Sequence, residues 1–204
     1  MPRRDSDTAE RYNLSVEKVM ELINVYKKPE LKLLLRLLYY TGGRVSEPLG
    51  LRPRDIIWDS RILMLPALKD KQRRQRNERK RVVVDTETLE LLRGFIQAQQ
   101  IRKDEFVIFR GITNGSTRRW KAWEIVKKAG ELIGEPWIHP HTLRHTFAVH
   151  WAEGGGDLLR LQRQLGHKRL STTTDMYIRF KTADIQKDYD RIFQNGGNDD
   201  KYTE

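Results

Sequence analysis

The sequence predicts a mainly α-helical domain with a small antiparallel β-sheet, an α+β fold. Apolar residues recur at helical spacing in several segments, whereas only two short runs are rich in β-branched residues. With 204 residues, of which 38% are hydrophobic and 33% charged, the chain can bury a core within one domain. It contains no cysteine, so disulfides, thiolate metal sites and thiol nucleophiles are all excluded.

Three helices are predicted before the first strand. Ser15 is a favourable N-cap for a helix whose apolar side chains, within 16–23, share one face. A leucine-rich helix is predicted over about 29–41, where a glycine pair ends it. A short helix over about 45–51 follows.

A β-hairpin is predicted from the short β-rich runs 61–65 and 81–84. The stretch 66–80 between them is charged and long for a hairpin loop, so we expect it to be functional or mobile. Further helices are predicted near 86–99, 117–133, 140–153, 157–165 and 183–194.

The domain organisation follows from these segments. Residues 1–13 are expected to form a basic flexible arm, 14–194 a single domain, and 195–204 a disordered tail. No stretch is apolar enough for a membrane span, and the N-terminus has no apolar core of a secretory signal. We therefore expect a cytoplasmic protein.

The charge of the chain predicts a polyanionic partner. The net charge is +11, and the 13 residues 69–81 hold eight basic residues against two acidic ones. Such clustering favours nucleic acid over a scatter of surface lysines. The expected DNA contacts from this cluster are Lys71, Arg73, Arg74, Arg76, Arg79, Lys80 and Arg81, and Lys69 lies at its start.

The first of three chemistry-bearing motifs is Thr41-Gly-Gly-Arg-Val-Ser-Glu47. Arg44 follows a glycine break at the start of a predicted helix, where backbone N–H groups and a guanidinium can cradle a phosphate. The alternative is a surface ion pair between Arg44 and Glu47, three residues further on.

The second motif places His141 and Arg144 at i, i+3, on one face of a predicted helix. Together they suit an anionic oxygen, although a solvated helix face is the plain alternative. A metal site through His141 and His145 is disfavoured, because the HExxH glutamate is missing. The third motif, Leu165-Gly-His167 followed by Tyr177, is by itself more typical of helix packing than of a nucleophile.

Taken together and in this order, the motifs resemble the tyrosine recombinase family of phage integrases and Xer-type enzymes. TGGRVSEPLGLRPRDI resembles the first arginine motif of that family. PHTLRHTFAVHWAEGGGDLLRLQRQLGHKRLSTTTDMY resembles its C-terminal signature, and the likeness runs from about 14 to 185. The resemblance implies the fold of a tyrosine recombinase catalytic domain. It also implies site-specific DNA cleavage and rejoining by a DNA-associated protein of prokaryotic or viral origin.

The resemblance implies roles at the scissile phosphate. Arg44 and Arg144 would bind the two non-bridging oxygens and stabilise the transition state, with Glu47 orienting an arginine. Tyr177 would attack phosphorus and form a 3′-phosphotyrosyl bond. No metal and no other cofactor is implied, and no G-x-x-x-x-G-K-[ST] motif for ATP is present.

The resemblance also implies the groups that move protons. His141 would accept the proton of the tyrosine, His167 would donate a hydrogen bond to the phosphate, and Lys69 would protonate the leaving 5′-oxygen. Lys71 is the second choice, because the family's Gly-Lys-Gly pattern is missing here. The spacing from His167 to Tyr177 is one residue longer than usual.

Further expectations concern the domain content, the partners and the alternative functions of the chain. We expect the chain to begin almost at the catalytic domain, without the N-terminal core-binding domain of the family, either as a minimal enzyme or as a fragment. The predicted helix 183–193 would either dock into a neighbouring protomer on double-stranded DNA or fold back on its own core. Two alternative functions remain: DNA relaxation by a type IB topoisomerase mechanism, and a DNA-binding regulator that does not cut.

Overall fold

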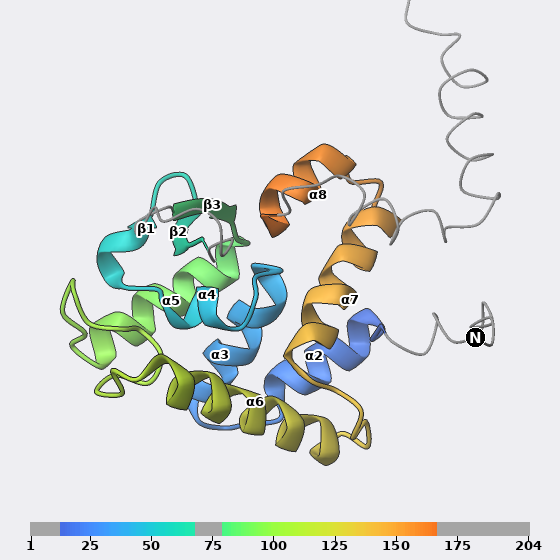
Figure 1. Cartoon of the computed structure of the whole chain (residues 1–204), viewed down its shortest axis with the longest axis horizontal. Coiled ribbons are helices and arrows are strands. Elements are labelled where there is room, and N and C mark those ends of the chain that lie inside the picture. The colour runs from blue at the N-terminus through green and yellow to red at the C-terminus, as the bar shows by residue number, and fades with distance from the viewer. Residues whose placement is uncertain (1–12, 68–78, 167–204) are drawn as a thin grey trace, which may run out of the picture. The chain divides into compact units, whose positions relative to one another are not determined.

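The computed structural model describes residues 13–67 and 79–166 (Figure 1). All of them belong to the first of two units into which the chain divides, Met1–Lys168 and Arg169–Glu204. The arm, most of the basic cluster, and everything after Gly166 lie outside the described residues. The expectations for 1–12, 68–78, 183–193 and 195–204 therefore have no structural counterpart here.

Helix α3 (Pro29–Tyr40) is the centre of the described unit. Every residue from Leu33 to Tyr39 is buried, as expected for a helix that is covered on all sides. Its main helical neighbours are α2 (Val16–Asn24), α5 (Thr86–Ala98) and α7 (Pro140–Glu153). Figure 1 shows α3 between them, with α6 (Gly115–Leu132) running along the lower edge.

The sheet has three antiparallel strands in the order β1 (Ile56–Ile57), β2 (Ile62–Pro66) and β3 (Arg79–Val83). Ile62 pairs with Val83 and Pro66 with Arg79. Leu63 and Leu65 on β2 and Val82 on β3 are fully buried, so one face of the sheet joins the core.

The remaining elements are short. Helix α4 (Ser46–Leu49) follows the turn after α3, and a 3₁₀ helix, η1 (Pro53–Asp55), leads into β1. Helix α8 (Leu158–Leu165) starts at its N-cap Asp157 and ends at Gly166, which has a left-handed conformation with φ of 71°. The end of α8 lies beside β3 (Figure 1).

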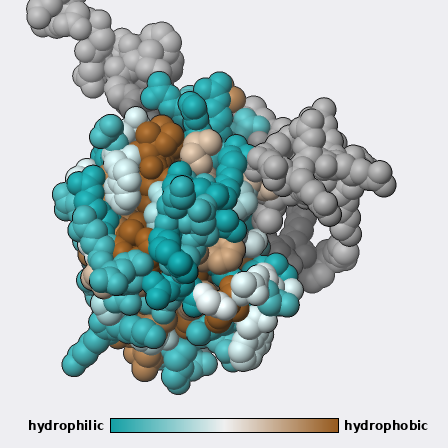
Figure 2. All heavy atoms as spheres, turned by 90° about the vertical axis from the view of Figure 1, so that its left-hand side faces the viewer, coloured by the Kyte–Doolittle hydropathy of each residue, from teal (hydrophilic) through white to brown (hydrophobic). Residues whose placement is uncertain are grey.

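The observed architecture confirms the predicted fold class and the predicted helices up to Leu165. The prediction missed η1 and the two-residue strand β1, and it began the last strand at 81 instead of Arg79. None of the helices in the described ranges is long and apolar enough to span a bilayer. Hydrophilic side chains cover most of the face that carries β1, interrupted by a few apolar patches (Figure 2).

Candidate active site

The turn after α3 brings the first arginine motif against α7. Gly42 has φ of 57°, and a Cβ atom there would lie 2.4 Å from the ring of Phe147 on α7. Only glycine fits both the backbone conformation and this close approach. The turn therefore presents the Gly42 carbonyl to α7, and Arg44 follows just before α4.

Arg144 on α7 connects three segments of the chain. Its Nη1 atom donates a hydrogen bond to the Gly42 carbonyl at 2.7 Å. Both terminal nitrogens donate to the carbonyl of Leu165, at the end of α8, at 3.2 Å. The residue is 7% exposed, so these contacts fix a buried guanidinium between the turn, α7 and α8.

Glu47 holds two cations around one buried carboxylate. Its Oε2 atom accepts a hydrogen bond from the backbone N–H of Arg44 at 3.0 Å, and Oε1 lies 3.6 Å from Arg44 Nη1. Lys80 Nζ lies 2.6 Å from Oε2. The Glu47 side chain is 1% exposed, whereas that of Arg44 is 40% exposed. The Arg44–Glu47 pair is thus not a surface ion pair, because its carboxylate is inside the protein.

We call Arg44, Glu47, Lys80 and Arg144 the cationic cluster. Burial and the nearby charge of Arg44 lower the pKa of Arg144 to about 10. Burial, then Arg144 and Arg44, lower the pKa of His141 below its usual value. Three cations and an imidazole therefore share a partly dehydrated region with one carboxylate, an arrangement that favours binding of an anion.

The basic residues assigned to DNA contact divide into described and undescribed positions. Arg79 on β3 forms an ion pair with Asp55 at 2.7 Å, and Arg81 on the same strand is exposed. Lys80, which lies between them on β3, contacts Glu47 and belongs to the cationic cluster. Lys69, Lys71, Arg73, Arg74, Arg76, His167 and Tyr177 lie outside the described residues.

The sequence interpretation missed the place of Lys80, although strand alternation could have revealed it. Lys80 lies directly opposite the buried Leu65 in the β2–β3 register. Along β3 it shares its face with the buried Val82 and, one residue past the strand, Val84. A strand begun at Arg79 would have predicted an inward-facing lysine.

Within the described residues, no group of three histidine or acidic side chains could hold a metal ion. The fold is that of a mainly helical domain, and its cationic cluster concentrates positive charge in a way that favours an anion. The phage integrase family matches residues 13–183, and the chain belongs to that family.

Similar proteins agree with this assignment. The chain is 37% identical over 146 residues to tyrosine recombinase XerD of Bifidobacterium longum, covering 70% of this chain and 47% of the relative. It is 31% identical over 179 residues to tyrosine recombinase XerA of Pyrococcus horikoshii, covering 86% and 59%. The chain thus spans about half the length of the relatives that it matches.

Solved structures share the fold. The crystal structure of XerA recombinase matches with a TM-score of 0.69 at 23% identity, over 89% of this chain and 65% of that one. XerH site-specific recombinase bound to its difH substrate matches with a TM-score of 0.62 at 19% identity, over 86% and 52%.

Proposed function

We propose that this chain is the catalytic part of a site-specific DNA recombinase, which cleaves and rejoins strands through a 3′-phosphotyrosyl bond to Tyr177. The observation that carries the proposal is that Arg44, paired with the buried Glu47, and Arg144, bonded to the Gly42 carbonyl two residues before Arg44, come together from segments about a hundred residues apart, and that their charges both act on His141. Membership of the phage integrase family supports the same reaction.

In the proposed reaction, the Tyr177 oxygen attacks phosphorus while the bond from phosphorus to the 5′-oxygen breaks. Arg44 and Arg144 bind the non-bridging oxygens, whose negative charge increases in the transition state. His141 accepts the tyrosine proton, and a lysine between the two strands protonates the leaving oxygen. Lys69 is the first choice for this lysine, and Lys71 is the second.

The roles of His167 and Glu47, and the rejoining step, follow from the same reaction. His167 donates a hydrogen bond to the phosphate, and Glu47 orients Arg44 through the contacts described above. Rejoining reverses the attack, so the phosphotyrosyl bond conserves the energy of the cleaved bond and no ATP is required.

Double-stranded DNA is the proposed substrate. The basic cluster 69–81, with the exposed Arg81, would contact phosphates, whereas Arg79 and Lys80 would first have to leave their carboxylate partners. Contacts of this kind release counterions, so affinity should fall steeply with salt. XerH in its solved complex binds its difH substrate, which is consistent with this proposal.

We also propose that protomers assemble on DNA through the helix predicted over 183–193, within the cytoplasm of a prokaryotic or virus-infected cell. The chain should then sediment as a monomer alone and as a larger complex on a duplex. A stable tetramer without DNA would contradict the assembly model.

Covalent trapping on a nicked suicide duplex tests the central proposal. The wild type should form a denaturation-resistant protein–DNA adduct, and Tyr177→Phe should form none while it still binds the duplex. Tyr202→Phe, in the C-terminal tail, is the matched control and should form the adduct normally. Normal binding without any wild-type adduct would favour the DNA-binding regulator instead.

A further inference from the structure

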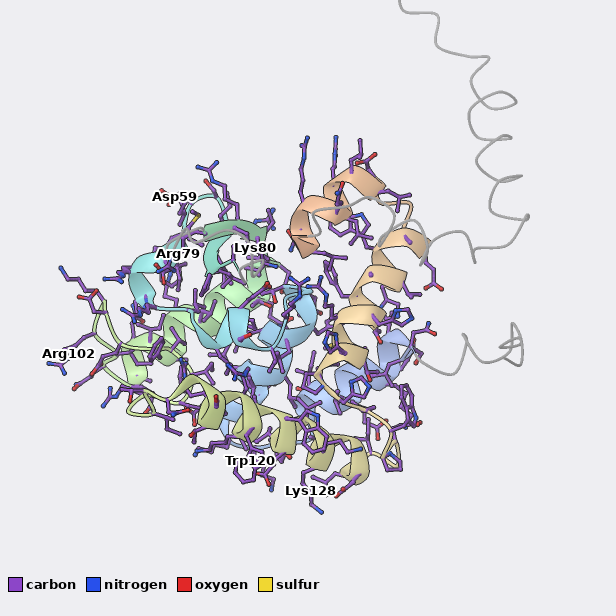
Figure 3. The ribbon with its side chains drawn as sticks, viewed as in Figure 1. Asp59, Arg79, Lys80, Arg102, Trp120 and Lys128 are labelled. Atoms are coloured by element: carbon purple, nitrogen blue, oxygen red, sulfur yellow. The ribbon has the colours of Figure 1, made fainter. Side chains whose placement is uncertain are left out.

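We propose that Lys80 is a positioning residue that fixes the two acceptor groups contacted by the phosphate-binding arginines, a role that rests on the proposed function. We call these two acceptor groups the anchors. Its ammonium group lies between Glu47, which contacts Arg44, and the Leu165 carbonyl, which contacts Arg144. Figure 3 shows Lys80 between the sheet and the end of α8, with Arg79 toward β1.

The first anchor is the Glu47 carboxylate. Lys80 Nζ lies 2.6 Å from Glu47 Oε2, and the two side chains are 10% and 1% exposed. Arg44 Nη1 is 3.6 Å from the other carboxylate oxygen, a looser contact. Because Lys80 neutralises the buried carboxylate, the half-exposed guanidinium of Arg44 is left to bind a phosphate oxygen.

The second anchor is the C-terminal end of α8. Lys80 Nζ donates hydrogen bonds to the carbonyls of Gln164 and Leu165, both at 3.3 Å. The last carbonyls of a helix lack partners inside the helix and carry its negative end, so a cation is favourable there. Arg144 donates to the same Leu165 carbonyl, so Lys80 and Arg144 share one acceptor.

The surrounding contacts keep α8 beside β3. The Gln164 side chain donates to the Val83 carbonyl at 2.8 Å and accepts from its N–H at 3.1 Å, like an additional strand partner. A Cβ atom at Gly166 would lie 3.1 Å from Lys80 Cδ, so glycine there leaves room for the lysine stem.

The donor inventory of Lys80 indicates positioning and not proton donation. An ammonium has three N–H groups, and Lys80 has three acceptors: the Glu47 carboxylate and the carbonyls of Gln164 and Leu165. All three donors are therefore committed inside the protein. Burial lowers the pKa of Lys80, the Glu47 carboxylate opposes that shift, and the nearby charges of Arg144 and Arg44 add to it.

Removing the ammonium should release both anchors. In Lys80→Met, the buried Glu47 would draw the Arg44 guanidinium inward, and the Leu165 carbonyl would lose one of its donors. We expect adduct formation at saturating DNA to slow by about 10- to 100-fold, the range found for residues that orient the ligands of a metal site. Lys103→Met removes an exposed lysine in a loop and should keep the wild-type rate.

Two suicide duplexes separate positioning from proton donation. One carries the ordinary 5′-oxygen at the scissile bond and the other carries sulfur, which leaves as a thiolate without a proton donor. Lys80→Met should be slow on both duplexes. A normal rate on the oxygen duplex, or a rate restored by sulfur, would overturn the positioning role.

Lys80→Arg provides a second test that does not depend on the fold of the methionine variant. A guanidinium keeps the charge and the donors but does not deprotonate, so a positioning role predicts that it recovers much of the rate. A folded Lys80→Arg protein as slow as Lys80→Met would refute the inference. Absence of an adduct with the wild type would instead refute the proposed function.

Discussion

Replacing Glu47 by glutamine tests whether one buried carboxylate compensates the cationic cluster. The carboxylate is the acceptor for Lys80 at 2.6 Å and for the Arg44 backbone at 3.0 Å, and Arg144 lies near enough for Glu47 to affect its pKa. In Glu47→Gln three cations stay together without their counterion, and the glutamine keeps nearly the same shape.

The size of the effect follows from burial. Removing one partner of a buried ion pair costs about 3–5 kcal/mol, and the low end applies because the amide oxygen can still accept from Lys80. For a domain of this size, each kcal/mol lowers the melting temperature by about 2–4 °C. The variant should therefore melt about 6–12 °C below the wild type.

Thermal unfolding by circular dichroism, with and without sulfate, is the assay. Sulfate should restore more stability to Glu47→Gln than to the wild type, because the anion replaces the missing charge among the cations. Glu90→Gln removes an exposed carboxylate on α5 and controls for the general stabilising effect of sulfate. A Glu47→Gln protein within 2 °C of the wild type would show that the carboxylate does not hold the cluster together.

Three further changes test the fold and the site. Leu34→Ala in the fully buried part of α3 should lower the free energy of unfolding by about 2–5 kcal/mol in urea titrations, and a loss below 1 kcal/mol would argue against this core. His141→Asn should lose less stability than the wild type between pH 7.5 and 5. The pKa of His141 is lowered from 6.5, so the unfolded chain takes up the proton more readily and wild-type stability falls below that pH; equal losses in both proteins would refute this. Gly42→Ala should destabilise by more than about 1 kcal/mol and slow adduct formation, because its Cβ would displace Phe147 and the carbonyl that accepts from Arg144. A normal adduct rate would mean that this carbonyl does not set the position of the guanidinium.

Local signals in the sequence were sufficient for the helices. The N-cap of α2 at Ser15, the glycine turn after α3 and the left-handed Gly166 after α8 are each marked by one or two residues. Strand β1 was not predicted, because two residues are too few to show an alternation of apolar and polar side chains. Only pairing with β2 defines the strand.

The first two residues of β3 were not predicted as strand for a different reason. Arg79 and Lys80 resemble a solvated loop in sequence, because the carboxylates that neutralise them, Asp55 and Glu47, are more than twenty residues away along the chain. Charge alone therefore assigned both residues to DNA. Tertiary pairing separates them, with Arg79 on the side of η1 and Lys80 among the arginines.

The described site places an excess of positive charge where negative charge grows during the proposed reaction. Arg44, Lys80 and Arg144 carry three positive charges, and Glu47 carries one negative charge, so the cluster has two positive charges in excess. A phosphodiester brings one negative charge, and the pentacoordinate phosphorane that forms when a phenolate attacks it brings two. Under the proposed function the tyrosine proton passes to His141, so the total charge of the site stays the same while a second negative charge develops on the oxygens that Arg44 and Arg144 bind. Because only interactions that strengthen in the transition state accelerate a reaction, the excess positive charge beside these oxygens serves the chemistry, and the buried Glu47 keeps the two arginines and Lys80 together.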